Sequence, residues 1–174
     1  MTTDIRSKAP TAPLGVFYFA VDSAQGEDGL SNRQYFGCDI LKVRELVLVP
    51  KSAMTRMPLT ELPVTGFVTI RGTSMPLLDL RAALGLGELP EADTLTCLVI
   101  DHQKKQVALR IAEPGSICNV TWGDVKPLDF DLLNRSGTFH GLVDDPEHNH
   151  VISLMDIGTF VTRLDTEKHE LLAA

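Results

Sequence analysis

The sequence predicts an all-β fold with about ten short strands, and with helices only as brief connectors or at the end of the chain. Apolar runs of a few residues recur along the 174 residues, and turn-forming residues separate them. These strands do not alternate with long helical segments, which excludes a parallel sheet built from βαβ units. Small closed barrels or a sandwich remain as the possible architectures.

The first strands follow a polar beginning. Met1–Leu14 is rich in threonine, serine and proline and is expected to form a loose arm. Val16–Val21 and Gln34–Ile40 have the alternation of half-buried strands. The polar stretch between them, Asp22–Arg33, is long for a hairpin loop.

The segment after the second strand is predicted to be helical. Ile40, Val43 and Leu46 or Val47 recur at helical spacing, which predicts one or two turns of helix over residues 41–47. A short strand, residues 47–49, is expected to follow. The three prolines of residues 50–63 predict an irregular connector.

A central hairpin organises the chain. Residues 67–70 and 75–78 are apolar, and the polar residues 71–74 between them include a glycine and predict the turn. Arg71 is expected at the exposed tip, where its guanidinium suits a carboxylate partner. Asp79 is a candidate N-cap for a short helix that ends at Gly85.

The second half continues with a linker, five strands and a closing helix. The predicted strands are residues 95–100, 106–112, 117–121, 138–143 and 150–155, with turns over 101–105, 113–116 and 144–149. Residues 126–137 are expected to be loop. Asp156 can cap a helix over residues 157–164, and residues 165–174 form a polar tail.

Composition limits the classes of partner. A net charge of −7 with interspersed charges argues against nucleic acid. The three cysteines, Cys38, Cys97 and Cys118, each lie in an apolar run, which favours buried reduced thiols in a cytosolic protein. The first residues lack the apolar core of a signal peptide, and no run approaches the ~20 apolar residues that span a bilayer. A cytoplasmic location is expected.

Catalytic and metal-binding patterns are weak. The sequence has no G-x-S-x-G motif and no phosphate-binding glycine loop in a strand–loop–helix context. The acidic and histidine residues near the last hairpin could ligate zinc if the strands brought them together, although they also suit a polar turn. They are His140, Asp144, Asp145, Glu147, His148 and His150. A binding module without cofactor or metal is therefore favoured; a ligand-binding barrel and a metal-dependent hydrolase are the alternatives.

Two segments carry a family resemblance. FGCDILKVRELV (Phe36–Val47) and GFVTIRGTSMPLLDLRAALGL (Gly66–Leu86) resemble the signature segments of the CheW-like chemotaxis coupling domain. The family pattern is an apolar strand, Ile-x-x-Val-x-Glu-Ile, a connector with proline, and Gly-Val-x-x-x-Arg-Gly-x-x-x-Pro-Val-x-Asp-Leu. The LVID…QVALRI hairpin and GLV…HVISLMDIGTFV also fit, so the resemblance covers Val16–Leu164.

The resemblance implies a fold and a function. Such domains fold as two SH3-like five-stranded barrels around a common core, and they have no catalytic activity. They link the cytoplasmic tips of chemoreceptors to the regulatory domain of a CheA-type histidine kinase. Residues 15–164 would be the coupling domain, with residues 1–14 as an arm. The implied partner-binding residues are Val43, Glu45 and Arg71, with their neighbours Leu41, Arg44 and Gly72.

Three departures from the family pattern leave an alternative open. The Asp22–Arg33 loop is longer than the usual turn, and Ile111–Pro114 replaces a frequent Val-Asp-x-Val. Val120–Val125 looks more like the coupling domain of CheV-type adaptors, which normally carry a receiver domain afterwards. The chain is therefore expected to be either a lone coupling protein or the coupling domain of an adaptor without its receiver.

Overall fold

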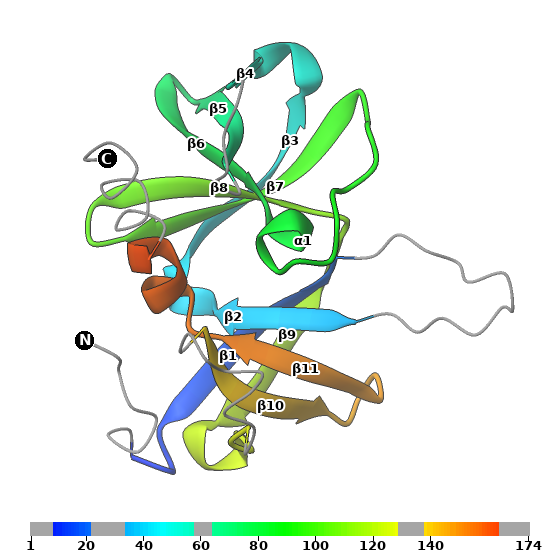
Figure 1. The fold of residues 1–174 in the computed structure, drawn as a ribbon. Coiled ribbons are helices and arrows are strands. Elements are labelled where there is room, and N and C mark those ends of the chain that lie inside the picture. Colours follow the sequence, from blue (N-terminus) through cyan, green and yellow to red (C-terminus); the bar gives the residue numbers. More distant parts are fainter. Residues whose placement is uncertain (1–8, 22–33, 58–63, 129–137, 164–174) are drawn as a thin grey trace, which may run out of the picture.

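A computed structural model describes residues 9–21, 34–57, 64–128 and 138–163, and these ranges contain two sheets that curl into barrel-like halves (Figure 1). The first half has the strand order β10-β11-β2-β1-β9. Its strands are β1 (Pro13–Ala20), β2 (Tyr35–Asp39), β9 (Glu113–Thr121), β10 (Phe139–Asp145) and β11 (His150–Met155).

The second half has the strand order β3-β7-β8-β6-β5-β4. Its strands are β3 (Val43–Pro50), β4 (Met54–Arg56), β5 (Val64–Ile70), β6 (Thr73–Asp79), β7 (Thr94–His102) and β8 (Lys105–Ile111). The second half is thus one continuous stretch of chain inserted between β2 and β9 of the first. The all-β fold with two barrel-like halves is confirmed. The second half has six strands instead of the expected five, because β4 is added to its edge beside β5.

Most neighbouring strands are antiparallel, and each half contains one parallel pair. β11 runs parallel to β2 in the first half, and β6 runs parallel to β8 in the second. These two pairs join strands that are distant in the sequence. They lie in the interior of each sheet and form without the long crossover helix of a βαβ unit.

Three groups of buried apolar side chains hold the halves together. One fills the first half, one fills the second, and the third lies between them and is called the shared core below. β7 lies between two of these groups, which explains why its sequence is apolar at almost every position. Leu95, Cys97 and Val99 face the interior of the second half, whereas Leu98 and Ile100 face the shared core. The strand predicted over residues 95–100 is confirmed, and both of its faces are covered.

Two helices occupy positions that the sequence predicts. α1 (Leu80–Ala83) begins at Asp79, whose carboxylate accepts the Ala82 N–H at 3.1 Å, and Gly85 follows with φ +75°. Residues 157–163 are helical, and Asp156 accepts the Thr159 N–H at 3.0 Å as its cap. Both helices place apolar side chains in or against the shared core.

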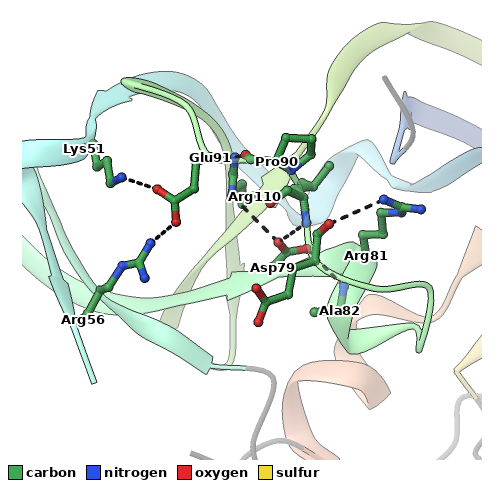
Figure 2. A network of polar contacts seen from close by, with 10 residues as sticks. Lys51, Arg56, Asp79, Arg81, Ala82, Pro90, Glu91 and Arg110 are labelled. Atoms are coloured by element: carbon green, nitrogen blue, oxygen red, sulfur yellow. Dashed lines mark hydrogen bonds and ion pairs between the residues drawn. The ribbon is translucent and has the colours of Figure 1, made fainter. Parts of the chain in front are cut away.

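The connector between α1 and β7 is fastened by charged side chains (Figure 2). Asp79 accepts the Leu89 N–H at 2.8 Å, and Arg110 donates to the carbonyls of Leu89 and Pro90. The Arg110 guanidinium lies 3.9 Å from the Asp79 carboxylate, and both side chains are largely buried. This group joins the end of β6, the connector and β8.

A second set of charges lies further along the same connector. Glu91 accepts hydrogen bonds from Lys51 and Arg56 (Figure 2). Lys51 belongs to η3 (Lys51–Ala53), which lies between β3 and β4, and Arg56 ends β4. The backbone N–H of Lys51 also donates to the backbone carbonyl of Asp93 at 2.8 Å. The connector is therefore tied to the far edge of the second half.

Several predicted boundaries are wrong. The helix predicted over residues 41–47 is a strand from Val43 onward, and only η2 (Ile40–Lys42) is helical, as a single 3₁₀ turn. The proline-rich connector contains β4, which pairs with β5. The turn predicted at Glu113 is part of β9, because Glu113 pairs with Ala20.

The structure describes only part of the two ends of the chain. β1 begins at Pro13 and Leu14 is buried, so the strand includes the last two residues of the expected arm. The rest of that arm up to residue 8, the 22–33 loop and the 165–174 tail lie outside the described residues. The expected domain limits, 15–164, stay a prediction.

Candidate functional site

The candidate site begins at the tight turn between the two halves. The Asp39 carboxylate accepts the Leu41 N–H at 3.0 Å and so starts η2. The Val43 N–H donates to the Ile40 carbonyl, and this hydrogen bond ends η2. Leu41, at the middle of the turn, is 86% exposed. A leucine this exposed is held outward by the turn, because the chain on both sides is paired in sheets.

β3 continues from this turn and forms one edge of the second half. Its pairing with β7 shifts between Val43, which opposes Ile100, and Glu45, which opposes Val99. Arg44 is the extra residue at this bulge. Because directly opposed residues share a face, Val43 lies on the side of the shared core and Glu45 on the side of the second half's interior.

The β5–β6 hairpin supplies the other part of the site. Its turn has two residues, Arg71 with φ +50° and Gly72 with φ +77°. Two successive left-handed residues form the turn whose twist matches antiparallel strands, and glycine adopts this conformation without strain. The turn therefore fixes the backbone from which the Arg71 side chain extends.

Glu45 and Arg71 meet across 26 positions in the sequence. Arg71 Nε donates to both Glu45 oxygens, Oε1 at 3.2 Å and Oε2 at 2.9 Å. The Glu45 side chain is only 20% exposed, whereas that of Arg71 is 78% exposed. The glutamate is thus the fixed member, and it orients an arginine that remains open to solvent.

The six residues predicted to bind partners fall into three groups. Glu45, Arg71 and the adjacent Gly72 come together at the hairpin turn. Leu41 and Val43 lie on η2 and at the start of β3, on the side of the shared core. Arg44 pairs instead with Asp101 of β7 at 3.3 Å and takes no part in the Glu45–Arg71 contact.

Sequence reasoning missed two apolar residues on the same strand. Leu46 is 43% exposed and Leu48 is 67% exposed, although both lie within β3. Leu46 opposes Leu98 of the shared core and Leu48 opposes Thr96, so both share a face with Val43. The alternation of Val47 and Val49 with these leucines is typical of a strand, and it is the signal that would have identified the leucines as residues of its opposite face. The apolar row Leu41, Val43, Leu46 and Leu48 then continues the candidate site along the edge.

The last hairpin does not assemble the metal ligands that its sequence contains. His150 opposes Asp145 near the turn, whereas His140 lies next to the Phe139–Met155 pair at the other end of the hairpin. Five residues along a strand correspond to roughly 17 Å. Among the described residues, no group of three or more histidine, cysteine, aspartate or glutamate side chains could hold a metal ion.

These polar residues have structural partners instead. The buried Asp145 carboxylate accepts the Glu147 N–H at 3.1 Å and lies 2.8 Å from His148 Nδ1. Although burial opposes the charge, these contacts and that of Tyr18 lower the pKa of Asp145. The His150 ring stacks on Tyr35, with ring centres 4.0 Å apart. The cluster therefore closes the turn of the hairpin.

The cysteines are free and buried, as the sequence predicts. Burial raises the pKa of Cys38 to about 12 and that of Cys97 to about 11. Burial also raises the pKa of Cys118, with nearby carboxylates adding to the effect. Thiols with raised pKa are poor nucleophiles at neutral pH. In the part of the chain that the structure describes, no helix is long and apolar enough to cross a membrane.

Comparisons with known proteins agree with this architecture. Residues 30–165 match the family model of the CheW-like domain. The chemotaxis protein CheV2 of Helicobacter pylori (strain ATCC 700392 / 26695) is 21% identical over 145 residues, which are 78% of this chain and 46% of that protein. This chain therefore spans about half the length of that relative.

A solved structure shares the fold. The crystal structure of the scaffolding protein TtCheW from Thermoanaerobacter tengcongensis superposes with a TM-score of 0.66 at 16% identity, covering 83% of this chain and 89% of that one. The two barrel-like halves with a shared core and the family match over most of the chain lead to one conclusion: this chain belongs to the CheW-like domain family.

Proposed function

We propose that this domain is a non-catalytic chemotaxis scaffold that joins the cytoplasmic tip of a chemoreceptor to the regulatory domain of a CheA-type histidine kinase. It would work in the cytoplasm at receptor arrays. Family membership supports this proposal, together with the chemotaxis and scaffolding names of the two similar proteins. The proposed contact surface consists of Leu41, Val43, Arg44, Glu45, Leu46, Leu48, Arg71 and Gly72.

One observation carries the proposal: an arginine that is fixed yet exposed. Arg71 gives only its Nε to Glu45, so the terminal nitrogens of the guanidinium extend toward solvent. Exposed ion pairs contribute about 0–1 kcal/mol to folding, so such a pair suits recognition better than stability. The apolar row of β3 lies along the same edge strand and would supply area for a partner.

The interior of each half supports a scaffold over a ligand-binding barrel. Buried apolar side chains from facing strands fill both halves. A barrel that binds a small molecule needs an enclosed apolar space with a few polar groups that orient the ligand. Here the unusual apolar side chains, Leu41 and Leu48 above all, lie on the outside.

The test reverses the charge of Arg71. Arg71→Glu places a second carboxylate beside Glu45 and removes the exposed cation. We expect a folded protein whose binding to receptor cytoplasmic fragments or to the kinase falls at least about tenfold, as expected for opposed charges at an interface. Binding is measured by pull-down and titration, and kinase coupling by phosphorylation in reconstituted receptor complexes.

Arg56→Glu is the matched control. Arg56 is also an exposed arginine that pairs with a glutamate, but it lies at the opposite edge of the second half. This variant carries the same change of charge and should bind and couple like the original protein. Normal kinase coupling by a folded Arg71→Glu protein would remove Arg71 from the contact surface.

A second proposal is that the domain serves a CheV-type adaptor. The observation that favours it is the similarity to CheV2, of which this chain spans 46%. The mass of the native protein, detected in cell extract with an antibody against this domain, distinguishes the two proposals. A mass equal to that of this chain supports a lone coupling protein, and a larger one supports an adaptor with a further domain.

A further inference from the structure

His102 occupies a contact between the second half and the helix over residues 157–163. It is the last residue of β7 and opposes Lys105 at the end of the β7–β8 hairpin. A Cβ added to Gly158 would lie 2.7 Å from His102 Cε1. The helix therefore packs directly on the imidazole, and it can do so because residue 158 has no side chain. In Figure 1 this helix, coloured orange-red, lies beside the β7–β8 hairpin and the start of the second half.

One nitrogen of this ring is buried and lacks a hydrogen bond within the described part of the chain. No group of residues 9–21, 34–57, 64–128 or 138–163 forms a hydrogen bond with the buried His102 Nδ1. A neutral imidazole carrying its proton on Nε2 leaves Nδ1 as an acceptor without a donor. A protonated imidazole has N–H groups on both nitrogens, so Nδ1 would become a buried donor without an acceptor. A buried charged donor without an acceptor costs more free energy than a buried neutral acceptor without a donor. The packing therefore favours the neutral ring.

The charges around His102 come from η2, β7, β8 and the residue that precedes the helix. Lys42 of η2 and the opposed Lys105 are positive, Asp101 is the neighbour in β7 and pairs with Arg44, and Asp156 precedes the helix. Burial, followed by Lys42, lowers the pKa of His102, and Asp156 opposes this effect.

The Asp156 carboxylate already contacts Thr159 and His140. Its two oxygens accept from the backbone N–H and the hydroxyl of Thr159, and His140 Nε2 lies 3.9 Å from the carboxylate. These contacts limit how far Asp156 can compensate a positive charge on His102.

We propose that His102 is a pH-sensitive contact, whose protonation loosens helix 157–163 from β7 and disturbs η2 through Lys42. The inference does not depend on the proposed partners. Because the folded state favours the neutral ring, the contribution of this contact to stability is complete above the ordinary histidine pKa of about 6.5. It is lost as the pH falls below that value and through the lowered pKa of His102.

The test is amide hydrogen exchange of the whole chain at about pH 7.5 and about pH 5.5, corrected for intrinsic exchange, combined with an NMR titration of the histidine rings. In the original protein, we expect protection of residues 157–163 to fall at least about threefold on acidification. His102 should titrate below about 6.5. In His102→Gln, the loss of protection on acidification should disappear.

His148→Gln is the matched control, because His148 lies at the β10–β11 turn, away from this helix. It should keep the acid-dependent loss of protection. The same loss in His102→Gln would overturn the proposal, as would titration of His102 at or above about 6.5 in the original protein. If His102→Gln does not fold, the titration of the original protein decides.

Discussion

Two arginine–carboxylate contacts lie at opposite ends of β6, and they differ in almost every respect. Arg71, before β6, is 78% exposed, and within the described ranges its side chain donates only to that of Glu45. Arg110 is 16% exposed and contacts Asp79, at the end of β6, which also accepts two backbone N–H groups. The first contact orients a side chain, and the second fixes the path of the chain.

This difference separates recognition from folding. Removing a carboxylate that satisfies buried backbone donors leaves those donors without partners, and each costs about 1–3 kcal/mol. Breaking a pair in which one member is exposed costs about 0–1 kcal/mol. Strong effects on stability are therefore expected at the Asp79 end of β6, and effects on binding at the Arg71 end.

The largest expected effect is that of Asp79→Ala. The variant removes the cap of α1, worth about 1 kcal/mol, and leaves the Leu89 N–H without an acceptor. We expect the free energy of unfolding, measured by urea titration, to fall by about 2–4 kcal/mol. Asp144→Ala is the control, since Asp144 is an exposed carboxylate in a surface ion pair with Lys126. A similar loss in both variants would contradict the comparison.

The next effect is that of Gly72→Ala. Its φ of +77° strains any residue with a Cβ, although no atom lies within 4 Å of the added methyl group. The free energy of unfolding should fall by about 1 kcal/mol. Ser74→Ala, an exposed position in β6, should change it by less than about 0.5 kcal/mol. An unchanged stability in Gly72→Ala would show that the turn relaxes at no cost.

Arg71→Gln should have a smaller effect on stability. It removes the charge but leaves Glu45 some access to water, so we expect a loss of no more than about 1 kcal/mol. Thermal and urea unfolding measure this loss. A loss as large as that of Asp79→Ala would mean that Arg71 serves the fold as much as recognition.

The smallest effect concerns Glu91. Hydrogen bonds from Lys51 and Arg56 lower its pKa, so this contact stabilises the fold above the ordinary glutamate pKa and is lost as the pH falls through the lowered value. Because Glu91 is exposed, salt should return its pKa toward the ordinary value. NMR titration at about 0.01 M and about 1 M salt measures this change. In Lys51→Gln/Arg56→Gln the salt dependence should largely disappear.

Local chemistry explains what the sequence could predict. The Asp79 cap, the Gly85 stop and the Arg71–Gly72 turn depend on residues within a few positions of one another. The nearly continuous apolar run of β7 likewise indicates a strand with two covered faces. Family resemblance added the arrangement as two barrels, which periodicity alone left open against a sandwich.

Long-range pairing explains what the sequence could not predict. Ile40, Val43 and Leu46 fit a helical spacing, but β7 pairs with this segment and makes it a strand. The bulge at Arg44 changes the face of every later residue, so the positions of Leu46 and Leu48 depend on register. The sequence predicts that Arg71 suits a carboxylate partner, but only the fold shows which one, because the β5–β6 hairpin brings Arg71 to Glu45 of β3.

The insertion of one half within the other has a consequence for synthesis. Residues 40–112, 73 in number, separate β2 from β9, so β1 and β2 leave the ribosome long before β9 and β11, which pair with them. At about 5–20 residues per second, the delay is roughly 4–15 s. The second half, whose strands are all made within this interval, can fold first. The apolar face of β1 and β2 then stays uncovered until β9 and β11 are made, and such transiently exposed apolar surface is prone to aggregate.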